Sequence, residues 1–218
     1  MTRRLVVILL ITGCLLTGCG GPVEESPIEA SFSYSGIVSI KTSDGAGSGF
    51  VIREEPVSYI IITAAHVVDM ETTVLVDKIE SDVLLVDYET DIAIICTPKL
   101  DQNWFVMSLS NAEIEEKCRV AGYVYENGFD SPLFVVYWGR VTSTDWTGMI
   151  SFNGGAFPGV SGGPLINESG KVLGICSQFS GAWGMPFDTA TLFASSENIR
   201  ILLEQMDEET ATTQPSGD

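Results

Sequence analysis

Apolar residues in the middle of the chain come in short runs separated by turn residues. The runs are rich in β-branched and aromatic residues, which favour strands, and Gly, Pro, Asn or Asp mark the breaks. Six runs precede Pro98, at residues 36–41, 48–52, 59–63, 73–76, 82–87 and 92–96. Six follow it, at residues 105–109, 118–123, 133–141, 149–152, 163–166 and 172–177. The succession predicts an all-β protein with two six-stranded antiparallel barrels or sandwiches.

One helix is predicted near the C-terminus, over residues 197–206. Its apolar residues recur at the helical spacing i, i+3, i+4 and i+7, so that they share one face. They are Ile199, Leu202, Leu203 and Met206. Ser195 or Ser196 is suited to cap the first turn. The acidic residues 207–218 that follow are predicted to be a disordered tail.

The N-terminus has the pattern of an export signal. A short basic segment precedes an apolar run at residues 5–16, which is too short for a membrane-spanning helix. The run ends in Leu16-Thr17-Gly18-Cys19, which resembles the lipobox of bacterial lipoproteins. That resemblance implies removal of residues 1–18 and lipidation of Cys19, which would place the protein on a membrane of the cell envelope. Cys14 is the weaker alternative, and a plain cleaved signal or an uncleaved anchor stays open.

Residues 19–34 are rich in Gly, Pro, Glu and Ser, and they are predicted to be a tether to a domain at residues 35–206. The net charge of −18 disfavours nucleic acid as a partner, because such a surface repels phosphate. With Cys19 acylated, three cysteines remain, so at most one disulfide can form. Cys96 and Cys176 have apolar neighbours and are predicted to be small core residues on strands, while the pairing of Cys118 is left open.

The segment Gly159-Val160-Ser161-Gly162-Gly163-Pro164 carries the first chemical signal. A serine hydroxyl attacks a carbonyl only when a base takes its proton and N–H donors stabilise the oxyanion. The glycines would let the backbone turn, so that the amides of Gly159 and Ser161 converge on one point. Taken alone, the segment is also compatible with a glycine-rich turn holding an incidental serine.

His66 follows the apolar strand 59–63 and is the single histidine of the chain. A lone histidine is often structural, but serine chemistry with the usual base would have to use this one. Asp91 immediately precedes the strand 92–96 and is the preferred carboxylate partner for the imidazole. Asp87, four residues earlier, is the alternative. One histidine cannot build a zinc site with these cysteine spacings, and no metal or cofactor is expected.

The motifs TAAH, DIA and GxSGGP, in the order His, Asp, Ser, resemble those of trypsin-like serine peptidases, and within them the bacterial HtrA/Deg protease domain. The resemblance runs from about residue 36 to residue 206 and includes the glycine-rich run at residues 45–52. It implies two perpendicular chymotrypsin-like barrels, with His66, Asp91 and Ser161 as a triad in the cleft between them. It also implies that Ser177, Gln178 and Phe179 pair with the substrate backbone, and that Gly155 floors the specificity pocket. An uncharged floor favours a small or medium apolar P1 residue.

The chain departs from the family pattern in three places. Val160 replaces the Asn or Asp usual before the serine, so the activation switch of zymogen-type trypsins is expected to be absent. No PDZ-like segment is expected after Met206, and residues 153–158 differ from the family pattern before the oxyanion hole. The expected function is an endopeptidase acting on exported or misfolded polypeptides, with oligomerisation left open. One alternative is a catalytically silent lipid-anchored binding module. Another is an esterase, which is disfavoured because the GxSxG elbow of α/β-hydrolases needs alternating helices that this sequence does not predict.

Overall fold

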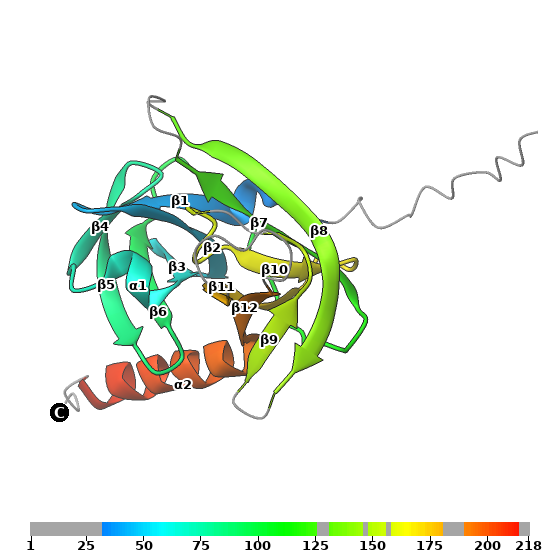
Figure 1. Cartoon of the computed structure of the whole chain (residues 1–218). Helices are drawn as coiled ribbons and strands as arrows, with labels where there is room; N and C mark the ends of the chain where they lie inside the picture. Colours follow the sequence, from blue (N-terminus) through cyan, green and yellow to red (C-terminus); the bar gives the residue numbers. More distant parts are fainter. Residues whose placement is uncertain (1–31, 126–130, 146–147, 156–157, 181–189, 214–218) are drawn as a thin grey trace, which may run out of the picture.

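The computed structural model describes residues 32–125, 131–145, 148–155, 158–180 and 190–213. Two closed antiparallel barrels make up the fold, as Figure 1 shows. The first barrel contains β1 (Ile37–Lys41), β2 (Ala46–Glu54), β3 (Ser58–Thr63), β4 (Thr73–Val76), β5 (Ile79–Asp87) and β6 (Ile92–Pro98). The second contains β7 (Lys117–Val124), β8 (Leu133–Thr144), β9 (Met149–Phe152), β10 (Pro164–Asn167), β11 (Val172–Ser180) and β12 (Ala190–Ser195). The predicted all-β class with two six-stranded barrels is confirmed.

Strands β3 and β6 each contain a continuous apolar run because both of their faces are buried. Ile61 lies in the core of the first barrel, whereas its neighbours Ile60 and Ile62 lie in a second cluster between the two barrels. In β6, Ile95 and Ile94 divide between the same two clusters. Side chains alternate across a strand, so a run without polar residues indicates a strand that is covered on both sides.

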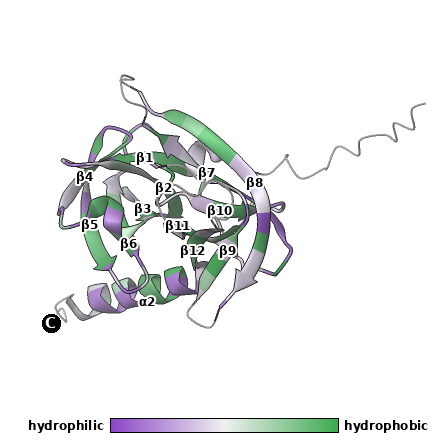
Figure 2. Ribbon diagram, in the orientation of Figure 1, coloured by the Kyte–Doolittle hydropathy of each residue, from purple (hydrophilic) through white to green (hydrophobic). Residues whose placement is uncertain are grey.

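Helix α2 (Ser196–Thr213) covers the seam between the barrels, and in Figure 1 it runs from β12 to a position beneath the first barrel. Its apolar face packs into the interbarrel cluster through the four residues predicted from the periodicity: Ile199, Leu202, Leu203 and Met206. Hydrophobic and hydrophilic residues alternate along α2 in Figure 2, as expected of a helix with one dry face.

The predicted end of this helix at Met206 is wrong, since the helix continues to Thr213. Residues 207–213 are therefore helical, against the expectation of a disordered tail over 207–218. Asp207 forms a bidentate contact with Arg53 of β2, at 2.7 and 3.0 Å. This ion pair, and helix propagation from an already docked face, extend the helix beyond its apolar residues. Residues 214–218 lie outside the described part of the chain.

The predicted strand at residues 105–109 is also wrong. This segment links the barrels: Met107 N donates to Val51 O of β2, and Leu109 makes an isolated parallel bridge with Val172 of β11. The segment crosses from one sheet to the other and is therefore apolar in the way a strand is. It is nevertheless part of neither barrel. The sixth strand of the second barrel is instead β12, which pairs with both β9 and β11.

The domain begins earlier than residue 35. Phe32 and Tyr34, assigned to the tether, surround the Arg119 guanidinium at 5.0 and 5.3 Å from their ring centroids. They pack on the second barrel, so residues 32–34 belong to the domain. The signal segment 1–18, Cys19 and the rest of the tether lie outside the described residues. Among the residues that are described, no helix is long and apolar enough to cross a membrane.

The three cysteines Cys96, Cys118 and Cys176 are free thiols. Cys118 and Cys176 are buried within the second barrel, and Cys96 is partly buried on β6. Burial raises the pKa of both Cys118 and Cys176 to about 12, since a thiolate loses its hydration there. The prediction of small core residues on strands is confirmed for Cys176, whereas Cys96 lies on its predicted strand but is only partly buried.

Candidate functional site

His66 lies on a one-turn helix, α1 (Ala65–Val68), immediately after β3. Val67 and Val68 of this turn pack into the core of the first barrel and hold the turn in place. At the first residue of the turn, Ala65 N donates to Asp91 O at 3.2 Å. The His66 side chain is 46% exposed, so the anchored turn presents the imidazole at the surface rather than in the core.

Asp91 holds His66 at two points. Its carboxylate accepts the His66 backbone N–H at 2.9 Å and lies 2.8 and 3.0 Å from His66 Nδ1. Asp91 itself has φ 58°, a left-handed conformation in which Asp is tolerated better than most residues. Asp87, the alternative carboxylate, instead accepts from Glu89 N and Thr90 Oγ1 and shapes the turn that delivers Asp91.

The second barrel contributes to the same carboxylate. Ser177 Oγ donates to Asp91 Oδ2 at 2.6 Å. Burial opposes the ionisation of Asp91, yet the hydrogen bonds from His66 and Ser177 outweigh it, and the pKa of Asp91 lies below its ordinary value of 3.8. The carboxylate is therefore ionised at neutral pH and able to orient and stabilise an imidazolium.

Ser161 lies in a tight loop before β10 that is tied to both barrels. On the second barrel, Gly162 N donates to Cys176 O and Cys176 N donates to Gly163 O. On the first, Ser48 N donates to Ser161 O at 2.8 Å. Gly162 has φ 83°, and a Cβ there would lie 2.1 Å from Ser48 O and 3.0 Å from Ala64 N. The loop is thus pressed against the segment that leads into His66.

Gly159 and Val160 shape the approach to Ser161. Gly159 has φ 100°, and a Cβ on it would lie 2.6 Å from Tyr123 O, so glycine is required on both counts. Val160 is fully buried in the core of the second barrel, and Gly163 N donates to Val160 O at 2.7 Å. An apolar residue replaces the Asn or Asp of the family pattern here because its side chain is part of the barrel core.

The four residues predicted to contact substrate lie in two places. Ser177 interrupts the pairing of β11 with β12, at a register shift between Cys176 and Gln178. The backbones of Gln178 and Phe179 pair with β12, while their side chains lie outside the described residues. Among the described residues, β10 pairs with β11 only as far as Pro164 and Ile175. The edge of residues 177–179 that faces away from β12 therefore has no strand partner among the described residues.

Gly155, the predicted floor of a specificity pocket, is exposed. A Cβ at this position would have no heavy atom within 4 Å. The position therefore has room for a larger side chain.

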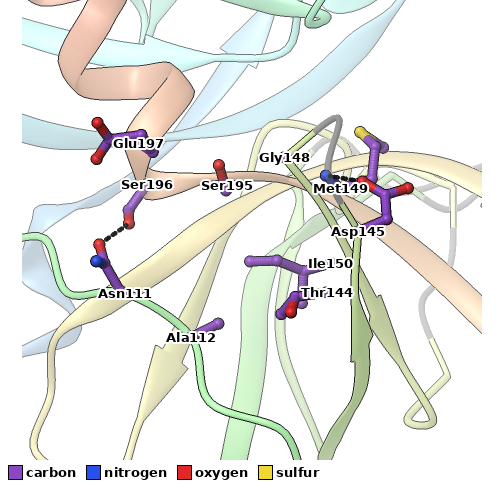
Figure 3. A pocket seen from close by; sticks show the side chains of 10 residues that line it. All are labelled: Asn111, Ala112, Thr144, Asp145, Gly148, Met149, Ile150, Ser195, Ser196 and Glu197. Carbon is purple, nitrogen blue, oxygen red and sulfur yellow. Dashed lines mark hydrogen bonds between the residues drawn. The ribbon is translucent and has the colours of Figure 1, made fainter.

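A hollow elsewhere on the surface shares no residue with this site. It lies where α2 begins, between the end of β8 and the start of β9, and its lining includes Asn111, Asp145, Ser195 and Glu197 (Figure 3). Ser196 Oγ donates to Ser110 O at 2.8 Å beside it, which fixes the first turn of α2. Across the described part of the chain, no three His, Cys, Asp or Glu side chains gather as metal ligands do.

Comparisons with known proteins agree with this fold. The family model described as a trypsin-like peptidase domain matches residues 47–175. Among solved structures, the serine endoprotease from Yersinia pestis matches with a TM-score of 0.63 and 21% identity over 79% of this chain. This chain covers 62% of the length of that protein, and at such identity the likeness concerns the fold. No curated protein sequence matches significantly.

Proposed function

This chain belongs to the trypsin-like peptidase domain family, and on that premise we propose that it is a serine endopeptidase. The family membership confirms the resemblance to trypsin-like serine peptidases. In the proposal these three residues are the general base, the orienting carboxylate and the nucleophile. The amides of Gly159 and Ser161 are the donors to the oxyanion.

The observation that carries the proposal is the arrangement around Asp91. One ionised carboxylate holds His66 through both its backbone N–H and its ring Nδ1. Because Nδ1 is hydrogen-bonded to Asp91, the other ring nitrogen, Nε2, is left to act as the base. Serine chemistry needs the imidazole in this tautomer. The loop bearing Ser161 is packed beside the segment that ends in His66.

The reaction proceeds through an acyl-enzyme. His66 takes the Ser161 Oγ proton as Oγ bonds to the scissile carbonyl carbon, and the carbonyl oxygen becomes an anion facing the Gly159 and Ser161 amides. His66 then delivers that proton to the amine as the C–N bond breaks. Water repeats the sequence on the ester, giving the acid product and restoring Ser161. Losing one oxyanion donor in such a site typically costs about 10²–10³ in rate.

Substrate is proposed to add as a strand along residues 177–179, whose outer edge is not paired in the described structure. The proposed substrates are exported or misfolded polypeptides, with a small or medium apolar residue before the cleaved bond. Lipidation of Cys19 is proposed to hold the enzyme on a membrane of the cell envelope. Mass spectrometry of the mature N-terminus tests this: an unmodified terminus, or one at another residue, would contradict it.

The enzyme proposal is tested by labelling the purified chain with a fluorophosphonate beside the Ser161→Ala variant. We expect covalent labelling of the native chain and none of the variant, together with cleavage of unfolded casein. Equal labelling of the two proteins, or no labelling of the folded native chain, would instead favour a silent binding module. Labelling without casein cleavage would favour an esterase.

A further inference from the structure

Ser48 of β2 is a fully buried serine in the first barrel whose polar groups reach the loop of the second barrel. Its hydroxyl donates to Gly159 O at 2.8 Å. The same oxygen accepts from Tyr123 N at 2.8 Å. Its backbone N–H donates to Ser161 O, also at 2.8 Å. A single residue thus binds the carbonyls of both Gly159 and Ser161.

The direction of the hydroxyl proton is determined by its partners. A backbone N–H can only donate, so the Ser48 oxygen must act as acceptor toward Tyr123. The one hydroxyl proton is then left for the Gly159 carbonyl, which can only accept. The side chain has no alternative arrangement that satisfies both buried groups. The contact is therefore a defined restraint on the loop.

The restraint acts where the loop has least support of its own. Gly159 has no side chain and adopts φ 100°, so steric contacts of a Cβ do not hold its backbone. The buried side chain of Val160, which lies between the two clamped residues, is apolar and offers the loop no hydrogen bond. Gly163 N holds Val160 O, and Ser48 holds the carbonyls on either side of it. Three consecutive carbonyls are thereby fixed, and with them the peptide planes that carry the N–H groups of Val160, Ser161 and Gly162.

We infer that Ser48 is a positioning residue, which holds the carbonyls of Gly159 and Ser161 so that the Ser161 amide, in the peptide between them, stays aimed at the developing oxyanion. The inference rests on the proposed function and deepens it. The clamp also explains how the loop is ordered without the Asn or Asp that the family pattern has at position 160. Preorganised donors are effective because they need no rearrangement when the charge forms.

The test compares Ser48→Ala with Ser48→Thr, which keeps the hydroxyl, and with Ser81→Ala as a matched control. Ser81 is also buried in the first barrel, but its hydroxyl donates to Ile79 O, within β5. Turnover of a peptide ester gives kcat and KM, and thermal unfolding shows that each variant is folded at the assay temperature. Amide hydrogen exchange of residues 159–163 reports on the loop without depending on activity.

For Ser48→Ala we expect kcat to fall about 10- to 100-fold with KM changed less than threefold, because a donor displaced by a fraction of an ångström is weakened rather than removed. Exchange at Gly162 and Gly163 should accelerate at least tenfold. Ser81→Ala should leave both kcat and exchange in the loop unchanged, whatever its melting temperature. Ser48→Thr, if it folds, should restore part of kcat.

Two results would overturn the inference while leaving the proposed function intact. One is an active native chain whose Ser48→Ala variant has the same kcat, and the other is unchanged loop exchange in a variant that is less active. A folded native chain without Ser161-dependent turnover would instead refute the proposed function, and the positioning role would fall with it. The activity of the native chain therefore separates the two failures.

Discussion

Ser177 Oγ lies 2.6 Å from Asp91 Oδ2, and the two residues come from different barrels. Asp91 precedes β6 of the first barrel, whereas Ser177 is at the irregularity in β11 of the second. The carboxylate that orients His66 is therefore stabilised across the barrel interface. Any change that separates the barrels would also loosen the imidazole.

Replacing Ser177 with alanine should raise the pKa of Asp91, because it removes one of the hydrogen bonds that hold this pKa down. A hydrogen bond to a charged group contributes about 1.5–3 kcal/mol, and we expect a loss of stability of that order at pH 7. Acid unfolding should begin at a higher pH than in the native chain. Urea titrations at a series of pH values measure both effects. Ser169→Ala, at an exposed serine, is the control, and equal acid sensitivity of the two variants would contradict the prediction.

Replacing Asp91 with asparagine should preserve the fold and abolish most activity. Asn tolerates the left-handed φ of 58° as well as Asp does, but it cannot hold the imidazole in the required tautomer. We expect kcat to fall about 10⁴-fold. Asp87→Asn makes the same change of charge away from His66 and should remain active.

The Asp91→Asn variant should also lose part of the pH dependence of stability. The folded pKa of Asp91 lies below its ordinary value of 3.8, so its contribution to stability is present above pH 3.8 and is lost as the pH falls through the folded pKa. Asparagine does not titrate, so the decline in stability below pH 4 should be shallower in the variant. A decline as steep as in the native chain would show that other groups account for it.

Replacing Gly162 with alanine should destabilise the chain strongly. The added Cβ would meet Ser48 O at 2.1 Å in a backbone with φ 83°. Left-handed strain and overpacking together should cost about 2–5 kcal/mol. Gly155→Ala, where a Cβ meets nothing within 4 Å, should change the free energy of unfolding by less than about 0.5 kcal/mol. Denaturant unfolding of the two variants decides between these outcomes.

Helix α2 should hold the two barrels together. Leu202 is 3% exposed within the interbarrel cluster, and we expect Leu202→Ala to cost about 2–5 kcal/mol of stability. The adjacent Ile201 is 47% exposed, and Ile201→Ala should be neutral within about 0.5 kcal/mol. Similar unfolding midpoints for the two variants would show that the helix does not contribute to holding the barrels together.

The thiols of Cys118 and Cys176 should resist alkylation in the folded chain. Their pKa values of about 12 leave very little thiolate at pH 8, and both side chains are buried. Iodoacetamide treatment followed by peptide mass spectrometry should find these two residues modified only after denaturation. Rapid modification of either one in the native protein would contradict their placement in the core.

The residue pattern by itself determined the fold class of the protein and singled out the candidate site residues. Strands β4 and β9 were predicted at their observed bounds, and the apolar face of α2 at its observed residues, because burial imposes a periodicity that a sequence records directly. Ser161, His66 and Asp91 were proposed from short motifs, because a local backbone requirement, such as the glycine at position 162, shows in the adjacent sequence.

Tertiary structure decided what depends on contacts between distant parts of the chain. The apolar run at residues 105–109 is a link between sheets, and β12 completes the second barrel, because strand partners are not encoded within either segment. The hydrogen bond of Ser177 to Asp91 and the clamp of Ser48 on residues 159–161 join positions 86 and 111 residues apart in sequence. A serine in a strand has the same local pattern whether or not such a partner exists, so only the folded arrangement shows which serines matter.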